Sequence, residues 1–464
     1  MQWAETVTEA AFEDREQAQL VVTDALVSEV RQALESGNLD LAAALARPLH
    51  AADLADLIQL LEPEERLRLV TALGPDMDPD TFSYLDETVR DEILEVLGPE
   101  RAGEIVAELQ TDDAVDIIEE LDEEEQREIL ERLPMPERIA VEEQLSYPED
   151  SAGRLMQREF VAVPEYWLVG QTIDYMRATP GLPDEFYDIF IVDPRMRPVG
   201  GVPVSRVLRS RRTVPIRELK LKELRLIPAT MDQEEVAFLF RQYGLVSAPV
   251  VDAEGRLIGV ITVDDVVDVI QEEAEDDILK LGGVTETDVF ARPLETVKRR
   301  APWLAVNLAT AILASLVIAM FEEAIARLVA LAVLMPIVAS MGGNAGTQTL
   351  TVAVRSLAVR ELTPANAARV IIKELLVGTI NGLVFLLVGA AVALLWFGDP
   401  TLALVFGIAM LINLTTAAFA GVVVPLLFHR LGLDPAVASG VFVTTVTDVV
   451  GFFAFLGLAG YFLT

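Results

Sequence analysis

The sequence has 464 residues, of which 52% are hydrophobic, and a formal net charge of −37, a combination untypical of one uniform soluble globule. It has no cysteine, which excludes disulfides, iron–sulfur clusters and thiolate zinc sites. Its two histidines, His50 and His429, are far apart, so oxygen ligands and hard cations such as Mg²⁺ or Ca²⁺ are favoured over a histidine-rich metal site. The acidic start, MQWAETVTEA, lacks the basic and apolar regions of a signal peptide.

Residues 1–150 carry most of the negative charge, with 41 acidic and 10 basic side chains and a net charge of −31. A loose pattern, in which Leu is followed by Pro or Asp, then Glu, and later by another Leu, recurs in the segments LLEPEERLRLVTALGP, VLGPERAGEIVAELQ and ELDEEEQREILERLP. We predict an acidic, all-α, superhelical N domain built from stacked helical hairpins. Most of its single carboxylates are expected to be solvated, although together they repel any nearby acidic surface.

Residues 151–270 contain an internal repeat. The segment IVDPRMRPVGGVPVSRVL (191–208) aligns with VVDAEGRLIGVITVDDVV (250–267) at a constant offset of 59 residues. Each copy predicts a strand, a turn, a second strand and the start of a helix, and a helical stretch precedes it.

This pattern, with GVITVDD ending the second copy, resembles a pair of CBS domains, the α/β modules that regulate many channels and transporters. In pairs that bind adenine nucleotides, the Thr and Asp of this ending contact the ribose. The resemblance therefore implies a nucleotide site such as one for ATP at Thr262 and Asp265, with a purely structural role for Thr262 as the alternative. The first copy departs from the pattern, with Pro203 and Arg206 at these places.

A second acidic cluster, DDVVDVIQEEAEDD (264–277), leads into an expected connecting helix at 271–300. If this cluster packs against the acidic N domain, like charges come together and repel. Cations between them would remove the repulsion. Mg²⁺ or Ca²⁺ fits because such sites keep bound waters and need few direct ligands.

Residues 301–464 form an expected membrane domain, with only 7 acidic and 6 basic side chains. Five apolar stretches, each able to cross roughly 30 Å of hydrocarbon, lie at 301–320, 328–354, 370–397, 401–428 and 436–463. Basic residues such as Lys298 and Arg355 flank the ends on the side of the N domain, whereas Glu322 and Asp399 lie in the opposite loops. By the positive-inside rule, we expect a plasma-membrane protein with its N-terminus in the cytoplasm and its C-terminus outside.

The fifth stretch contains a carboxylate, Asp448, roughly half-way along VFVTTVTDVVGFFAF. A carboxylate at mid-bilayer is costly unless it meets water, an ion or a partner. Thr444, Thr445 and Thr447 supply hydroxyl groups beside it. We favour a cation site in a pore, and a protonated or hydrogen-bonded structural Asp is the alternative.

Other polar groups also fall within the stretches. The second contains MGGNAGTQ (341–348), which indicates either locally opened backbone or tight helix packing. Asn381, Asn413, Thr415 and Thr416 add groups that could line a path or join helices.

The acidic helical domain, the CBS pair, a connecting helix and five spans with GGNAGTQ and a mid-span Asp together resemble the MgtE family of bacterial Mg²⁺ channels. The resemblance implies a homodimer in the lipid bilayer, with Asp448 as the pore carboxylate of each subunit and Asp434 near the cytoplasmic mouth. It implies regulatory Mg²⁺ ligands at Asp232, Glu234, Asp265, Asp268, Glu273, Asp276 and Asp277, facing Asp112 and Asp116, and at Asp80 by a weaker local alignment. The sequence departs from the family pattern at Gly244 and Gly440, and its motif varies at Ala345 and Thr347.

The mechanism that this resemblance implies is a Mg²⁺ pore gated by cytoplasmic Mg²⁺ bound between the N domain, the CBS pair and the connecting helix. An ion-coupled carrier of divalent metals such as Co²⁺ or Mn²⁺ is one alternative. It needs a second titratable group in the spans, and Lys373 and Glu374 are expected to be interfacial. A membrane-anchored sensor of Mg²⁺ or nucleotide that transports nothing is another. No P-loop, pump, hydrolase or triad motif indicates an enzyme, and no nucleic-acid partner is expected.

Overall fold

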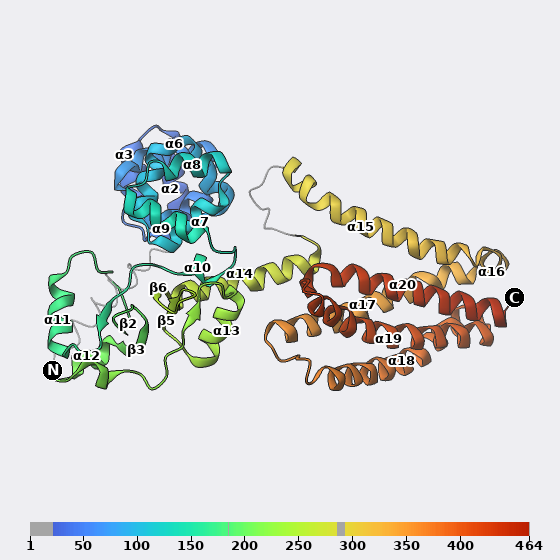
Figure 1. The fold of residues 1–464 in the computed structure, drawn as a ribbon. Coiled ribbons are helices and arrows are strands. Elements are labelled where there is room, and N and C mark those ends of the chain that lie inside the picture. Colours follow the sequence, from blue (N-terminus) through green and yellow to red (C-terminus); the bar gives the residue numbers. More distant parts are fainter. Residues whose placement is uncertain (1–21, 184, 285–292, 464) are drawn as a thin grey trace, which may run out of the picture. The chain divides into compact units, whose positions relative to one another are not determined.

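The computed structural model describes residues 22–183, 185–284 and 293–463. The chain forms two compact units, Met1–Ile270 and Gln271–Thr464. The described strands all lie in the first unit, and the described part of the second unit is helical (Figure 1). The all-α N domain, the α/β CBS pair and the five-helix membrane domain that the sequence predicts are therefore confirmed.

The N domain consists of short helices that begin at the Asp, Asn, Thr and Pro positions of the acidic segments. Its elements are α2 (Asp24–Glu35), α3 (Leu39–Ala46), α4 (Ala51–Gln59), α5 (Pro63–Leu73), η1 (Gly74–Asp76), η2 (Pro79–Tyr84), α6 (Glu87–Glu108), α7 (Thr111–Glu120), α8 (Glu123–Leu130) and α9 (Met135–Leu145). Side chains such as Asn38, Asp86 and Asp122 accept hydrogen bonds from the first free amides of the helices that follow them. Gly98, with φ of 79°, bends α6 where Pro99 follows.

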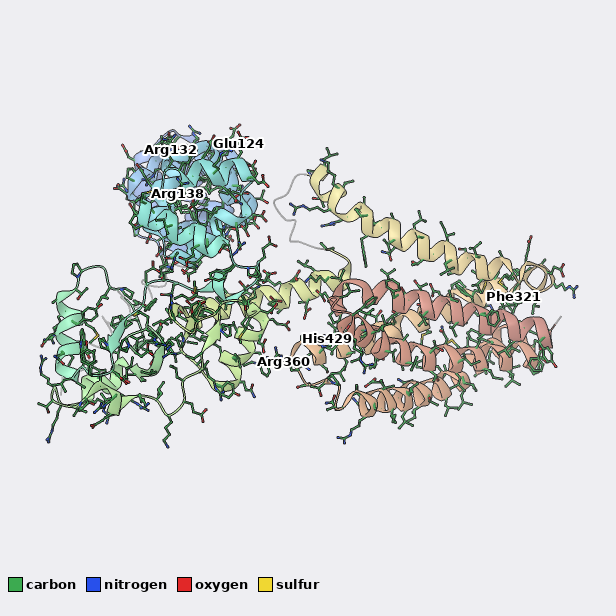
Figure 2. The ribbon with its side chains drawn as sticks, viewed as in Figure 1. Glu124, Arg132, Arg138, Phe321, Arg360 and His429 are labelled. Atoms are coloured by element: carbon green, nitrogen blue, oxygen red, sulfur yellow. The ribbon has the colours of Figure 1, made fainter. Side chains whose placement is uncertain are left out.

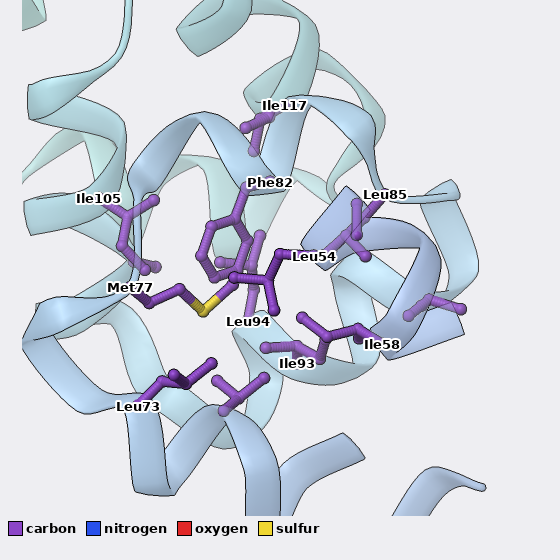
Figure 3. Packing of buried hydrophobic residues seen from close by; sticks show 14 of the residues in the cluster. Leu54, Ile58, Leu73, Met77, Phe82, Leu85, Ile93, Leu94, Ile105 and Ile117 are labelled. Atoms are coloured by element: carbon purple, nitrogen blue, oxygen red, sulfur yellow. The ribbon is translucent and has the colours of Figure 1, made fainter. Parts of the chain in front are cut away.

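The core of the N domain is apolar despite the charge of its surface. Phe82 of η2 lies among Leu54, Ile93, Leu94 and the side chains around them (Figure 3). Figure 2 shows charged residues such as Glu124, Arg132 and Arg138 on the outside of this domain. The carboxylates are therefore arranged over a packed scaffold that can hold them in fixed positions.

The CBS pair has two three-stranded sheets with the same topology. It comprises α10 (Ala152–Leu155), β1 (Ala162–Pro164), α11 (Val169–Ala178), β2 (Asp188–Val192), β3 (Pro198–Pro203), α12 (Val204–Arg209), η3 (Ile216–Leu219), β4 (Ile227–Pro228), α13 (Gln233–Tyr243), β5 (Ser247–Val251) and β6 (Leu257–Thr262). In each sheet the first two strands are parallel and the last two antiparallel. Asp188 pairs with Pro203, and 59 residues later Ser247 pairs with Thr262, so the strand register follows the sequence repeat.

Helix α14 (Val263–Gly282) begins at the end of β6 and continues into the expected connecting segment. It ends at Gly282, and α15 (Pro293–Ala319) begins eleven residues later and runs on into the first membrane span. The described part of 271–300 is therefore two helical pieces, and residues 285–292 lie outside the described residues.

The membrane domain contains α15, the short α16 (Glu322–Arg327), α17 (Ala330–Ala358), α18 (Ala367–Phe397), α19 (Pro400–Arg430) and α20 (Pro435–Phe462). Five of these helices are long and apolar enough to span a membrane, at the five predicted places. Arg360 and His429 lie at one end of the bundle and Phe321 at the other (Figure 2).

Glycines allow α18 and α19 to approach closely. A Cβ added at Gly378 would lie 2.4 Å from the Ala418 Cβ, and one at Gly382 would lie 3.1 Å from the Cα and carbonyl oxygen of Leu411. These glycines are four residues apart, the spacing of small-residue motifs between membrane helices.

We expect Gly382→Ala to destabilise the protein, because backbone atoms of α19 cannot move away from the added methyl without separating the helices. Such overpacking costs about 1–3 kcal/mol, which should lower the melting temperature in detergent by about 3–10 °C. Gly343→Ala is the control, since its nearest neighbour would be the Thr444 Cγ2 at 3.9 Å, an ordinary contact. Equal loss in both variants would contradict this account of the packing.

Candidate functional site

Asp448 lies in the middle of α20 and is half-buried. None of the described residues forms a hydrogen bond or ion pair with its carboxylate. The hydroxyl groups nearby are bound to their own helix: Thr444 donates to the Gly440 carbonyl at 3.0 Å and Thr445 to that of Val441 at 2.6 Å. These hydroxyl oxygens keep lone pairs that can accept from water or contact a cation. The half-buried carboxylate thus has no hydrogen-bond or ion-pair partner in the described part of this chain.

The MGGNAGTQ segment lies at the depth of Asp448. Gly343 approaches Thr444, and a Cβ at Gly346 would lie 2.6 Å from Val443. Helix α17 is continuous through the segment, so tight packing explains its glycines and the expectation of opened backbone is wrong.

The polar residues of α17 do not share this packing role. Asn344, Thr347, Gln348 and Thr351 are exposed and follow one another at helical spacing, so they form a stripe along one face of α17. In hydrocarbon such a stripe would be costly, and it is therefore a surface for water or for another protein chain.

Asn413 of α19 joins helices and does not face the outside. It is fully buried and donates from Nδ2 to the Val338 carbonyl of α17 at 2.8 Å. Gly342 and Gly451 make room for its amide, because a Cβ on either would come within 2.7 Å of Asn413 Nδ2. The packing of α20 one turn beyond Asp448 therefore depends on this amide.

Lys373 and Glu374 at the start of α18 differ from each other. Lys373 is exposed, whereas Glu374 is buried at 9% exposure; that both lie at the membrane interface stays a prediction. The rotation of 100° per residue along a helix turns neighbouring side chains to different faces. Glu374 faces α17 and α19, where it lines a cavity with Gln348 and Asn381.

A cluster of carboxylates lies where the N domain meets the CBS pair within the first unit. It contains Asp112 and Asp113 of α7 and Asp265 of α14. Burial, followed by the charge of Asp265, raises the pKa of Asp112 well above its usual range. Burial is the largest cause that raises the pKa of Asp113 to about 7 and that of Asp265 to about 6. These shifts mean that the carboxylates are close enough to destabilise one another's charged forms.

A second group of charges links α14 to the start of α20. Lys280 lies 2.7 Å from an Asp434 carboxylate oxygen and is also paired with Asp276. Burial lowers the pKa of Lys280, but hydrogen bonds to Asp276 and Asp434 outweigh it and raise that pKa. Burial, followed by Asp434, raises the pKa of Asp277 to about 6. Asp434 also caps α20 through the Ala436 amide.

The remaining predicted ligands are distributed over both units. Asp232 caps α13 by accepting from the Glu234 amide, and Asp116 accepts from the buried Arg90. The pKa of Asp80 is raised, first by burial and second by the negative charge of Asp78. The pKa of Asp268 is raised in the same way by burial and by the charge of Asp264. Glu273 lies on α14 between the two groups. Among the described residues, no three His, Asp or Glu side chains have the geometry to hold a metal ion.

Sequence reasoning missed Asp113 and Lys280. Asp113 directly follows Asp112 in the sequence, and Lys280 is four residues after Asp276, a spacing that predicts an ion pair. The two family departures have local explanations. Gly244 follows the last residue of α13 and has a φ of 61°, a conformation that an acidic residue rarely adopts. A Cβ added at Gly440 would lie 3.7 Å from the Leu281 carbonyl oxygen, which is an ordinary contact.

Thr262 and Asp265, the predicted nucleotide ligands, bind each other. The Thr262 hydroxyl donates to the Asp265 carboxylate at 2.8 Å, and the Thr262 amide donates to the same oxygen at 3.2 Å. In the first copy, Arg206 donates to the carbonyls of Leu219 and Lys220 instead. The pair thus stabilises the start of α14 and also presents polar groups at the end of β6.

Comparison with known proteins agrees with this arrangement. The sequence profile of the MgtE divalent cation transporter matches residues 335–458, that of the MgtE intracellular N domain matches 49–150, and that of the CBS domain matches 216–272. The magnesium transporter MgtE of Thermus thermophilus is 36% identical over 316 residues, which cover 67% of this chain and 70% of that protein. The chain belongs to the MgtE family. The magnesium transporter MgtE of Enterococcus faecalis is 32% identical over 68% of this chain and 70% of its own length.

Among solved structures, the cytosolic domain of the Mg²⁺ channel MgtE in complex with ATP is similar to this MgtE-family chain, with 32% identity, a TM-score of 0.49, and coverage of 52% of this chain and 99% of that one. Members of the MgtE family are transporters, which confirms that the chain is not an enzyme. Membership of a transporter family also argues against the alternative function of a membrane-anchored sensor that transports nothing.

Proposed function

We propose that this MgtE-family protein is a homodimeric Mg²⁺ channel of the plasma membrane. The observation that carries the proposal is Asp448, a carboxylate without a described partner at the depth of the exposed polar stripe of α17. Facing lipid, both would be costly. Facing a second copy across a water-filled path, they would supply two carboxylates and a ring of amide and hydroxyl groups.

Such a site suits a hydrated cation. Mg²⁺ releases its waters reluctantly and binds through few direct carboxylates, so the Asp448 pair would attract the ion by charge while amides such as Asn344 contact its water shell. Selection would then depend on the size and charge of the hydrated ion. The basic end of the bundle, with Arg360 and His429, supports a cytoplasmic N-terminus and an outside C-terminus.

Gating would follow from the carboxylate cluster of Asp112, Asp113 and Asp265. At high cytoplasmic Mg²⁺, ions bound there would neutralise the repulsion and hold the N domain on the CBS pair. At low Mg²⁺ the like charges would separate the domains. This is a two-state equilibrium that the ligand shifts by binding one state better.

The second charge group would pass this change to the pore. Lys280 is paired with Asp434, the residue directly before α20, and the Asp277 carboxylate lies near both of these groups. A Mg²⁺ ion between Asp277 and Asp434 would fix α14 against α20, the helix that carries Asp448. An adenine nucleotide at Thr262 and Asp265 would act on the same helix, and it would have to replace the hydrogen bond between these two side chains.

The experiment that tests the function is flux into proteoliposomes with Mg²⁺, Co²⁺ or Mn²⁺ outside and low or high Mg²⁺ on the side of the N domain. We expect Mg²⁺ flux that does not depend on a proton or sodium gradient and that decreases at millimolar Mg²⁺ on the cytoplasmic side. Flux that requires a proton or sodium gradient would favour the ion-coupled carrier instead. Flux unaffected by cytoplasmic Mg²⁺ would contradict the gating.

A further inference from the structure

A cavity of about 180 Å³ lies between α17, α18 and α19; Asp448 is not among its lining residues, and Gln348 is the one residue that it shares with the polar stripe of α17. Its polar lining consists of the Glu374 carboxylate, the side-chain amides of Gln348 and Asn381, and the Thr349 hydroxyl. The volume is that of several water molecules. Such a group of oxygen atoms is the ligand set of a hard cation.

Glu374 is the only acidic residue of this cavity, and it is well enclosed. Its side chain is 11% exposed, and one carboxylate oxygen lies 3.1 Å from the Lys373 Nζ. The Lys373 side chain is 67% exposed, so its ammonium group can leave for the membrane surface without unpacking the helices. Without Lys373, the carboxylate would be an uncompensated charge among membrane helices, which is costly.

The cavity is a fixed feature of the helix packing. Gly378, in its wall, brings α18 into contact with Ala418, and Gly421 brings α19 against Thr349, where an added Cβ would lie 2.8 Å from the Thr349 Cβ. The close contacts of α19 with both neighbours hold the two polar walls at a set distance. Polar side chains that line the same cavity as a buried carboxylate indicate a binding site.

We propose that this cavity binds one monovalent cation, with Na⁺ as the probe, through Glu374 and the neutral oxygens of Gln348, Thr349 and Asn381. A monovalent ion matches the single carboxylate, whereas a divalent ion would leave one positive charge uncompensated within the membrane domain. The Lys373 ammonium group occupies the position of such an ion's charge and exchanges with it. This site goes beyond the transport path at Asp448 and does not depend on it.

The test is the melting temperature of the full-length protein in detergent as NaCl replaces choline chloride at constant ionic strength. A ligand that binds the folded state raises its stability, so Na⁺ should raise the melting temperature of the wild type saturably, by about 2–4 °C. Glu374→Gln should abolish the rise. Asp448→Asn should retain it, so failure of this site and failure of the proposed pore are distinguishable.

Lys373→Met provides a second variant that does not remove the carboxylate. Because it removes the competing ammonium group, Na⁺ should stabilise this variant at lower concentration than the wild type. Equal Na⁺ responses in the wild type, Glu374→Gln and Lys373→Met would overturn the proposal. Stabilisation that depends on Glu374 but is produced by MgCl₂ and not by NaCl would overturn the assignment to a monovalent ion.

Discussion

Asp448→Asn should reduce Mg²⁺ flux at low cytoplasmic Mg²⁺ by at least about tenfold, because it removes the charge that draws the cation into the membrane domain. The side chain keeps its size and its place on α20, so the fold should remain intact. The measurement is Mg²⁺ uptake into proteoliposomes at matched protein content, together with the melting temperature of the variant.

Asp399→Asn is the matched control for this change. Asp399 is also a carboxylate of the membrane domain, but it caps α19 by accepting from the amides of Thr401 and Leu402. Asn serves equally well as a cap, so both the fold and the flux should be preserved. Flux through Asp448→Asn that equals flux through Asp399→Asn would contradict the pore role.

Neutralising the cluster between the N domain and the CBS pair should remove the Mg²⁺ response. The double variant Asp112→Asn, Asp113→Asn removes both α7 carboxylates, so Asp265 no longer faces like charges from α7 and the site keeps only one of its three carboxylates. In the full-length variant, we expect the rate of limited proteolysis to differ by less than about twofold between zero and 10 mM Mg²⁺. In the wild type, the same change in Mg²⁺ should alter the rate by at least about tenfold. Asp91→Asn is the control, since burial raises its pKa to about 6 without involvement of Asp265.

The same cluster predicts a pH dependence of the wild type. The raised pKa values of about 7 for Asp113 and about 6 for Asp265 belong to the closed arrangement, which therefore binds more protons than the separated one. Closure without Mg²⁺ should become more favourable as the pH decreases from 7.5 towards 5.5, and the effect should be smaller in the double variant, which keeps only Asp265 of the three carboxylates. Proteolysis rates corrected with an unstructured substrate measure it, and equal protection at both pH values would contradict the role of the cluster.

The sequence determined the parts that depend on local chemistry. Hydrocarbon favours spans whose backbone groups bond within their own helix, so the five long apolar stretches became α15, α17, α18, α19 and α20. The offset of 59 residues fixed the matching strand registers of the two CBS copies, since side chains alternate between the faces of a sheet. Asp448 was recognisable because a charge is costly at mid-membrane wherever its helix packs.

Only the tertiary structure decided which faces meet. Lys373 and Glu374 look alike in the sequence, yet helix packing buries only Glu374, which lines the cavity between α17, α18 and α19. Asp113 and Asp265 are 152 residues apart in the chain, and their mutual effect on pKa arises only when α7 and α14 come together. Helix periodicity gives each residue a face, but long-range packing determines the neighbour of that face, and burial and charge depend on the neighbour.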